Sequence, residues 1–210
     1  RSGTVEYRLG EDIGQGLDQL ARAHGTTRFM VVHAALAVLL ARLSATSDIA
    51  VATPVAGRGD VVLDDLVGMF VNTLVLRTEV TPGQSLAELL GQVRRIDLDA
   101  FSHADVPFER VVEALDPVRS ESFEPLAQVL LVLDQSGLGP TAVGDLEITA
   151  EDPGADAAKF DLTVGMPETS AGEITGKIIY ATDLFDHAGA EHIAAAFRSL
   201  LIEFATAATT

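Results

Sequence analysis

The sequence contains no cysteine and no tryptophan, and only two of its 210 residues are lysine. The absence of cysteine excludes disulfides, thiolate metal ligands and a cysteine nucleophile. Any metal site would therefore depend on histidine and carboxylates, and the five histidines are scattered along the chain. We expect no metal site.

Positive charge is also scarce, because 14 Lys and Arg residues stand against 31 Asp and Glu residues and give a formal net charge of −17. Nucleic acids and anionic membranes are bound through basic surfaces, so the sequence argues against both as partners. The first nine residues lack the apolar region of a signal peptide, and no apolar run reaches the length of a membrane span. We expect a soluble, cytoplasmic piece of a larger chain.

Apolar residues make up 48% of the chain, which is enough for a packed core. Their spacing predicts helices at 12–23, 27–43, 85–97, 105–115 and 186–205. Runs of strand length lie at 5–9, 48–55, 71–80, 126–133, 146–149, 160–164 and 174–180. This order predicts an α/β fold, a two-layer sandwich in which a mixed, open β-sheet carries its helices on one face.

Local signals mark several boundaries of these elements. Gly25 is expected to stop the first helix, and Thr26 or Thr27 to cap the second. Ser85 and Glu88 have the spacing of a capping box. Residues 120–158 carry eight acids, no Lys, Arg or His, and several glycines, which predicts a long loop or an excursion from the sheet.

Asn72 and Thr73 interrupt an apolar run. A buried amide needs hydrogen-bond partners, so Asn72 is either a structural hydrogen-bond centre or part of a polar site. Residues 57–59, Gly-Arg-Gly, lack the lysine and the strand-to-helix context of a phosphate-binding loop. The residues alone do not identify a catalytic site.

The run 103–109 has the pattern of a helix start. In that interpretation Asp105 caps the helix, Pro107 occupies its first turn and Phe108 packs against the core. Lys159 and Asp161 place opposite charges at a strand start, which usually gives an ion pair of small energy.

Five runs together resemble the C-terminal lobe of the condensation domains of non-ribosomal peptide synthetases. They are residues 53–58, 67–77, 103–109, 119–126 and 159–163. The fourth resembles the family's Arg-Asp-x-Ser-Arg-x-Pro-Leu element and departs from it at Ser120 and Phe123. The resemblance covers residues 12–205 in the family's order and spacing, and it is specific as a set although each run alone is weak.

The resemblance implies that residues 1–210 form a single lobe related to the chloramphenicol acetyltransferase fold. Such domains carry a His-His-x-x-x-Asp-Gly motif on their N-terminal lobe, and no two histidines are adjacent here. In the family, a donor acyl thioester and an acceptor amine, both held on phosphopantetheine arms of carrier domains, are joined into an amide. We expect the fragment alone to be inactive and to bind no cofactor directly. Alternatively, it is a non-catalytic lobe that docks carriers or acts as a scaffold.

The implied partners are the N-terminal lobe of the same domain, donor and acceptor carrier domains, and an adjacent adenylation domain. Residues 137–158 are the candidate for the segment that crosses to the other lobe in this family. Carrier domains tend to be acidic, so docking would use apolar contacts and local arginines such as Arg22 and Arg28.

Residue roles are also carried over from the resemblance. Asn72 is placed near the tunnel between the lobes, and Arg58 and Thr73 receive the same role more weakly. His103 is expected to pack or cap. Structural ion pairs are expected for Arg77, Arg119 and Asp161. The other motif residues are also expected to be structural: Asp105, Pro107, Phe108 and Glu109.

Overall fold

The computed structural model describes residues 1–56, 65–117, 123–134, 141–143, 146–148, 158–167 and 173–207. Its strands are β1 (Ser2–Leu9), β2 (Asp48–Ala56), β3 (Val71–Glu79), β4 (Val129–Asp134), β5 (Thr141–Val143), β6 (Leu146–Ile148), β7 (Leu162–Pro167) and β8 (Ile174–Ala181). Its helices are α1 (Glu11–Ala23), α2 (Arg28–Ser44), α3 (Leu86–Ser102), α4 (Phe108–Leu115) and α5 (His187–Ala207). The predicted elements are therefore present, with boundaries shifted by a few residues.

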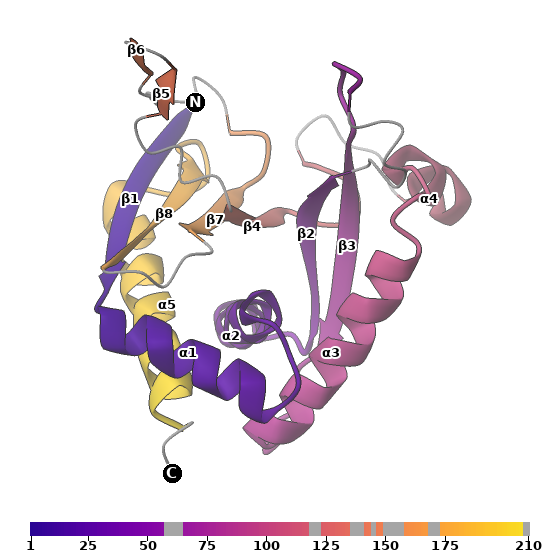
Figure 1. Cartoon of the computed structure of the whole chain (residues 1–210). Helices are drawn as coiled ribbons and strands as arrows, with labels where there is room; N and C mark the ends of the chain where they lie inside the picture. The colour runs from indigo at the N-terminus through magenta and orange to yellow at the C-terminus, as the bar shows by residue number, and fades with distance from the viewer. Residues whose placement is uncertain are drawn as a thin grey trace.

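Six strands form one mixed sheet in the order β1-β8-β7-β4-β2-β3. The pairs β1–β8, β7–β8 and β2–β3 are antiparallel, whereas β4 runs parallel to both β2 and β7. Pro54, expected at the end or edge of a strand, lies inside β2, which continues to Ala56 while paired with β3. The long helices gather on one side of the sheet, and α4 lies beyond the β3 edge (Figure 1). The α/β two-layer fold class is confirmed.

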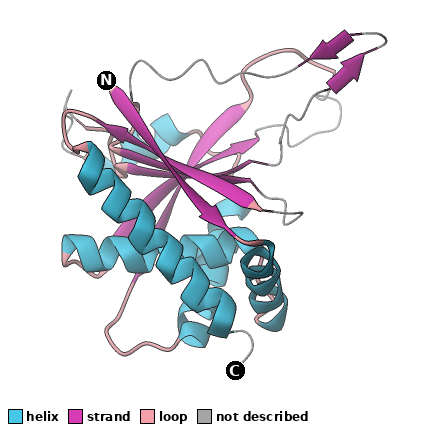
Figure 2. Ribbon diagram, turned by 90° about the vertical axis from the view of Figure 1, so that its left-hand side faces the viewer, coloured by secondary structure: helices cyan, strands magenta, loops and turns pink. Residues whose placement is uncertain are grey.

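The core lies between the sheet and its helices. Alternate residues of β1, β3, β7 and β8 in the main sheet are buried, as in β8, where Ile174, Ile178 and Tyr180 are buried. Helix α2 passes through the middle of the helical layer and is buried along most of its length, as the apolar pattern predicted. Helix α5 packs against α1, α2 and β1, so the last described element lies on the first (Figure 2).

The predicted local signals are confirmed in atomic detail. The Ser85 hydroxyl accepts a hydrogen bond from the Glu88 amide, and the Glu88 carboxylate accepts one from the Ser85 amide. The Thr27 hydroxyl caps α2 by accepting from the Met30 amide at 3.3 Å. Gly25 follows the C-cap residue His24 of α1 with a positive φ of 62° and so provides the left-handed residue that ends the helix.

The proposed crossover segment, residues 137–158, lies mostly outside the described residues. Strands β5 and β6, which fall within it, pair with each other in an antiparallel two-stranded sheet separate from the main one. The crossing to a second lobe stays a prediction.

No single helix of the described residues is both long enough and apolar enough to span a membrane. Only α1 and α2 taken together, across a bend of 101°, have the length and hydropathy of a span.

Candidate functional site

Asn72 joins β3 to the loop between α3 and α4. Its side-chain amide donates hydrogen bonds to the backbone oxygens of Ala104 at 2.9 Å and Val106 at 2.7 Å. Its side-chain oxygen accepts from the amides of Thr73 at 2.8 Å and Phe108 at 3.1 Å. Both donors and the acceptor oxygen are therefore engaged within the chain itself, which favours the structural side of the two predicted roles.

These bonds explain how the loop after α3 is held. His103 is the C-terminal capping residue of α3, and its Nδ1 lies 2.8 Å from the Asp99 carbonyl oxygen, in agreement with the predicted capping role. Helix α4 begins at Phe108 with Pro107 in the N-cap position and no cap from a local side chain. The prediction that Asp105 caps this helix is wrong, because Asn72, from a distant strand, accepts the hydrogen bond of the Phe108 amide.

The neighbouring motif residues have different surroundings. Glu109 lies in the first turn of α4, where a negative charge is favourable. Thr73 follows Asn72 in β3, so the two side chains lie on opposite faces of the sheet, with Thr73 opposite Pro54 on the face away from the helices. The two predicted site residues do not converge on one point.

Arg77 forms the predicted ion pair. Its guanidinium donates two hydrogen bonds to the Asp48 carboxylate, at 2.8 and 2.7 Å, and holds the pKa of Asp48 below its usual value. For Asp161, burial raises the pKa of the carboxyl, and no ion pair to it is present among the described residues. Arg58 and Arg119 lie outside the described residues, so their roles stay predictions.

A pocket of about 590 Å³ lies beside Asn72. It is lined by residues 53–56 at the end of β2, by Phe29 of α2, by Phe101 and Ala104 at the end of α3, and by Leu133 of β4. Val55 is the register partner of Asn72, and Ala104 accepts one of its hydrogen bonds. The Asn72 contacts therefore form one rim of this pocket.

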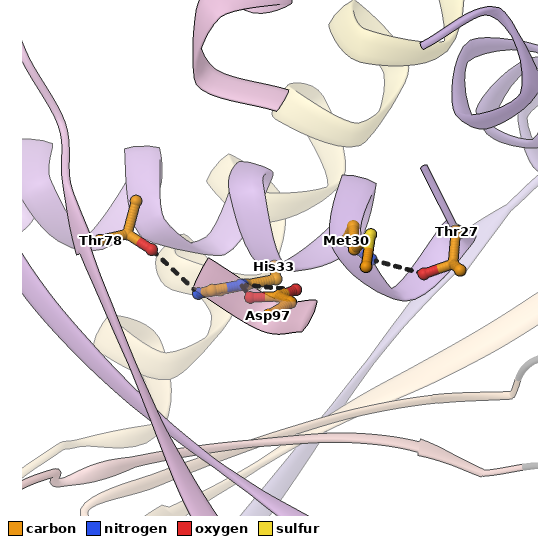
Figure 3. A network of polar contacts seen from close by, with 5 residues as sticks. All are labelled: Thr27, Met30, His33, Thr78 and Asp97. Atoms are coloured by element: carbon orange, nitrogen blue, oxygen red, sulfur yellow. Dashed lines mark hydrogen bonds and ion pairs between the residues drawn. The ribbon is translucent and has the colours of Figure 1, made fainter. Parts of the chain in front are cut away.

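A buried polar network joins α2, α3 and β3 (Figure 3). His33 Nδ1 lies 2.9 Å from Oδ1 of Asp97, and His33 Nε2 lies 3.4 Å from the Thr78 hydroxyl. All three residues have a relative exposure of 0%. A carboxylate only accepts hydrogen bonds, so the Nδ1–H of His33 donates to Asp97.

The sequence did not predict this contact between His33, Asp97 and Thr78. The signal present in the sequence was a polar side chain on the apolar face of each of two helices. The network also supports the pocket, because the Phe29 ring lies 6.2 Å from the His33 ring and 5.9 Å, edge to face, from the Phe101 ring.

Arg28 is not the exposed docking arginine that we expected. It is 8% exposed, and its guanidinium contacts both carboxylate oxygens of Asp18, at 2.7 and 2.6 Å. It also donates to the Gly14 carbonyl oxygen at 3.3 Å and so ties α2 to α1. Arg22 stays exposed near the end of α1.

No group of three or more metal-ligating side chains occurs in the part of the chain that the structure describes.

Comparison with known proteins gives a consistent match along the chain. The family model described as "Condensation domain" matches residues 1–210. A probable non-canonical nonribosomal peptide synthetase, CymA, from Salinispora arenicola is 42% identical over 193 residues, which are 92% of this chain and 2% of that protein. A dimodular nonribosomal peptide synthase from Bacillus subtilis is 39% identical over 203 residues, covering 94% of this chain and 8% of its own length.

Among solved structures, the X-domain from teicoplanin biosynthesis has a TM-score of 0.88 at 29% identity, covering 98% of this chain and 47% of that one. The X-domain was also solved in complex with OxyB, with a TM-score of 0.87 at 29% identity, covering 98% of this chain and 46% of that one. The chain thus spans a small part of the curated relatives and about half of these structures. Family model, relatives and fold agree, and the chain belongs to the condensation-domain family of nonribosomal peptide synthetases.

Proposed function

We propose that the chain is the C-terminal lobe of a condensation domain that forms an amide between a carrier-bound donor acyl thioester and a carrier-bound acceptor amine. The observation that carries the proposal is the family match over residues 1–210, combined with coverage of only 47% of the X-domain chain. The missing half would be the N-terminal lobe with the His-His-x-x-x-Asp-Gly motif. No adjacent histidines occur in this sequence.

In the proposed reaction, the nitrogen of the acceptor amine attacks the thioester carbonyl carbon. The C–N bond forms, the C–S bond breaks, and the donor's phosphopantetheine thiol leaves with the proton that the amine loses. The histidine motif of the other lobe would lie at the reaction centre, so this lobe supplies binding and positioning. The chain alone would then be inactive.

Asn72 acts in this proposal as a positioning residue. Three of its four hydrogen bonds hold the loop between α3 and α4 against the start of β3, and the fourth is to the adjacent Thr73 amide. A loop held at both of its ends presents a fixed surface to a substrate arm, at little cost in conformational entropy on binding. Thr73 and Arg58 are assigned to the tunnel wall by resemblance.

The proposed partners are the N-terminal lobe, the two carrier domains and a neighbouring adenylation domain. Among the described residues, no helix covers the sheet face that carries Thr73, so this face is available to the second lobe. A second candidate function is a non-catalytic docking lobe, because the X-domain of similar fold was solved in complex with OxyB.

A test of the proposal measures amide formation from purified donor and acceptor carriers. We expect turnover by the parent protein containing both lobes and none by the 210-residue chain. Turnover by the chain alone would show that catalysis does not need the other lobe. A parent that binds carriers but forms no amide, and lacks the histidine motif, would support the docking function.

A variant separates positioning from folding in the same assay. In the parent, Asn72→Ala is expected to slow condensation while the parent keeps its circular dichroism spectrum and carrier binding. Unchanged turnover would reduce Asn72 to a purely structural role.

A further inference from the structure

We propose that the pocket beside Asn72 binds an uncharged aromatic side chain that ends in a hydrogen-bonding group, of the phenol type, on a carrier-bound aminoacyl substrate. The delivery of that substrate rests on the proposed function. The walls of the pocket, one buried hydroxyl and the uncharged lining support this ligand class.

The walls suit an aromatic ring. Phe29 and Phe101 stand edge to face with their centroids 5.9 Å apart, and Phe101 keeps 41% of its surface exposed. Leu133 and Val55 add aliphatic surface. Aromatic rings pack edge to face or offset against one another, so a third ring can add to this pair. The volume of about 590 Å³ is in the range of small-molecule sites.

Thr53 is the polar group of the pocket. The residue is 2% exposed, and its hydroxyl has no hydrogen-bond partner among the described residues. Every fully enclosed side-chain polar atom of the described residues does have a partner. The Thr53 hydroxyl is therefore not sealed in the core, and the space that it reaches is the pocket it lines.

A buried hydroxyl without a partner selects its ligand. Pairing it with a ligand hydroxyl gains a hydrogen bond, whereas an entirely apolar ligand leaves it unpaired, and sites of this kind reject analogues that lack the polar group. None of the lining residues is ionisable, so a charged side chain would be buried without a counter-charge. A phenol ring meets both conditions.

The position of the pocket connects it with Asn72. Ala104 lines the pocket and accepts a hydrogen bond from the Asn72 amide, and Val55 pairs with Asn72 across the strands. Two of the residues that contact or pair with Asn72 thus also line the pocket.

The first experiment uses the 210-residue chain and two probes, p-cresol and toluene, which differ by one hydroxyl. Binding is followed by NMR titration, with the shifts of Thr53, Val55 and Ala104 reporting the site. We expect p-cresol to bind about fivefold or more tightly than toluene, since one hydrogen bond contributes about 1 kcal/mol. Thr53→Val keeps the side-chain shape and is expected to abolish the preference.

The matched control is Thr175→Val, on the exposed part of β8 and outside the pocket, which should leave the preference unchanged. The proposal is overturned if neither probe shifts the pocket residues at saturation, or if Thr53→Val keeps the preference for p-cresol.

A second experiment places the same comparison in the parent protein, with tyrosyl and phenylalanyl carriers as substrates. We expect kcat/KM to favour the tyrosyl substrate, and Thr53→Val to remove that advantage. A parent that forms no amide while the isolated chain binds p-cresol would refute the proposed function and leave the pocket standing. Amide formation without a tyrosyl advantage would refute the pocket alone.

Discussion

His33 Nδ1 lies 2.9 Å from Oδ1 of Asp97, and neither side chain has exposed area. The two residues are 64 positions apart and bring the middle of α2 against α3. Thr78 of β3 adds a contact at 3.4 Å to the other ring nitrogen. One polar network therefore fixes the relative position of three elements inside an otherwise apolar layer.

Removing one partner of the His33–Asp97 pair should destabilise the fold more than removing both. His33→Leu leaves the buried Asp97 carboxylate without a hydrogen-bond partner among the described residues, and such losses cost about 3–5 kcal/mol. The double variant His33→Leu/Asp97→Leu replaces the pair with apolar volume and is expected within about 2 kcal/mol of the wild type. Urea unfolding of the two single variants and the double variant gives the coupling free energy between His33 and Asp97. Strictly additive losses in the free energy of unfolding would contradict the prediction.

Asn72→Asp tests the two donated hydrogen bonds. The variant keeps the acceptor oxygen but places negative charge beside the carbonyl oxygens of Ala104 and Val106. We expect a loss of about 2 kcal/mol or more in the free energy of unfolding, with faster amide exchange at Phe108. Gln92→Glu, which changes an amide at an exposed hydrogen bond, is the control and should stay within about 0.5 kcal/mol. Equal effects of both variants would argue that the Asn72 hydrogen bonds do not hold the loop between α3 and α4.

Gly16 marks a close approach of α1 to α5. A Cβ at this position would lie 2.9 Å from Ala205 Cβ and 3.0 Å from the Ala205 carbonyl oxygen. We expect Gly16→Ala to destabilise the fold by about 1–3 kcal/mol through overpacking. Gly91→Ala, in α3 with nothing within 4 Å of the added Cβ, should instead stabilise by about 0.5–1 kcal/mol. Thermal melts of the two variants should therefore shift in opposite directions.

Because Tyr7 is buried, we expect the folded chain to lose stability at alkaline pH. Burial raises the pKa of its phenol above the ordinary value of 10.0. The neutral phenol is favoured in the folded chain, so this stability is fully present below pH 10.0 and is lost as the pH rises above it.

The measurement is simple because the chain has two tyrosines and no tryptophan. In Tyr180→Phe, phenolate absorbance reports Tyr7 alone. We expect the folded variant to stay un-ionised at pH values at which the same chain in urea has titrated. Coincident titration of the two states would contradict the burial argument. Tyr7→Phe should flatten the alkaline decline in stability.

Sequence patterns predicted the parts of the fold whose causes are local. The Ser85–Glu88 capping box, the Thr27 cap and the Gly25 stop each depend on residues within four positions of one another. The period of apolar residues likewise placed each long helix. The resemblance supplied the family, because five short motifs in one order are specific where single motifs are not.

The interactions that could not be predicted join residues distant in sequence. Arg28 was expected at the surface because the pattern does not show that Asp18, ten residues earlier on α1, faces it across the turn. Asp105 was a better local cap candidate than Asn72, 36 residues before Phe108, yet tertiary structure brought the amide closer. Nothing in the local sequence distinguishes Thr53 from other strand threonines, because its pocket is completed by the distant residues Phe29 and Phe101.

The position of β1 has a consequence for synthesis of the chain. Along its whole length β1 pairs with β8, and Arg198 of α5 donates a hydrogen bond to the Arg8 backbone oxygen at 2.8 Å. These partners are translated more than 160 residues later, so β1 leaves the ribosome long before anything can pair with it. Contacts of such separation slow folding and leave strand edges open to wrong pairing. During translation, β1 therefore stays without its β-sheet partner until β8 has been synthesised.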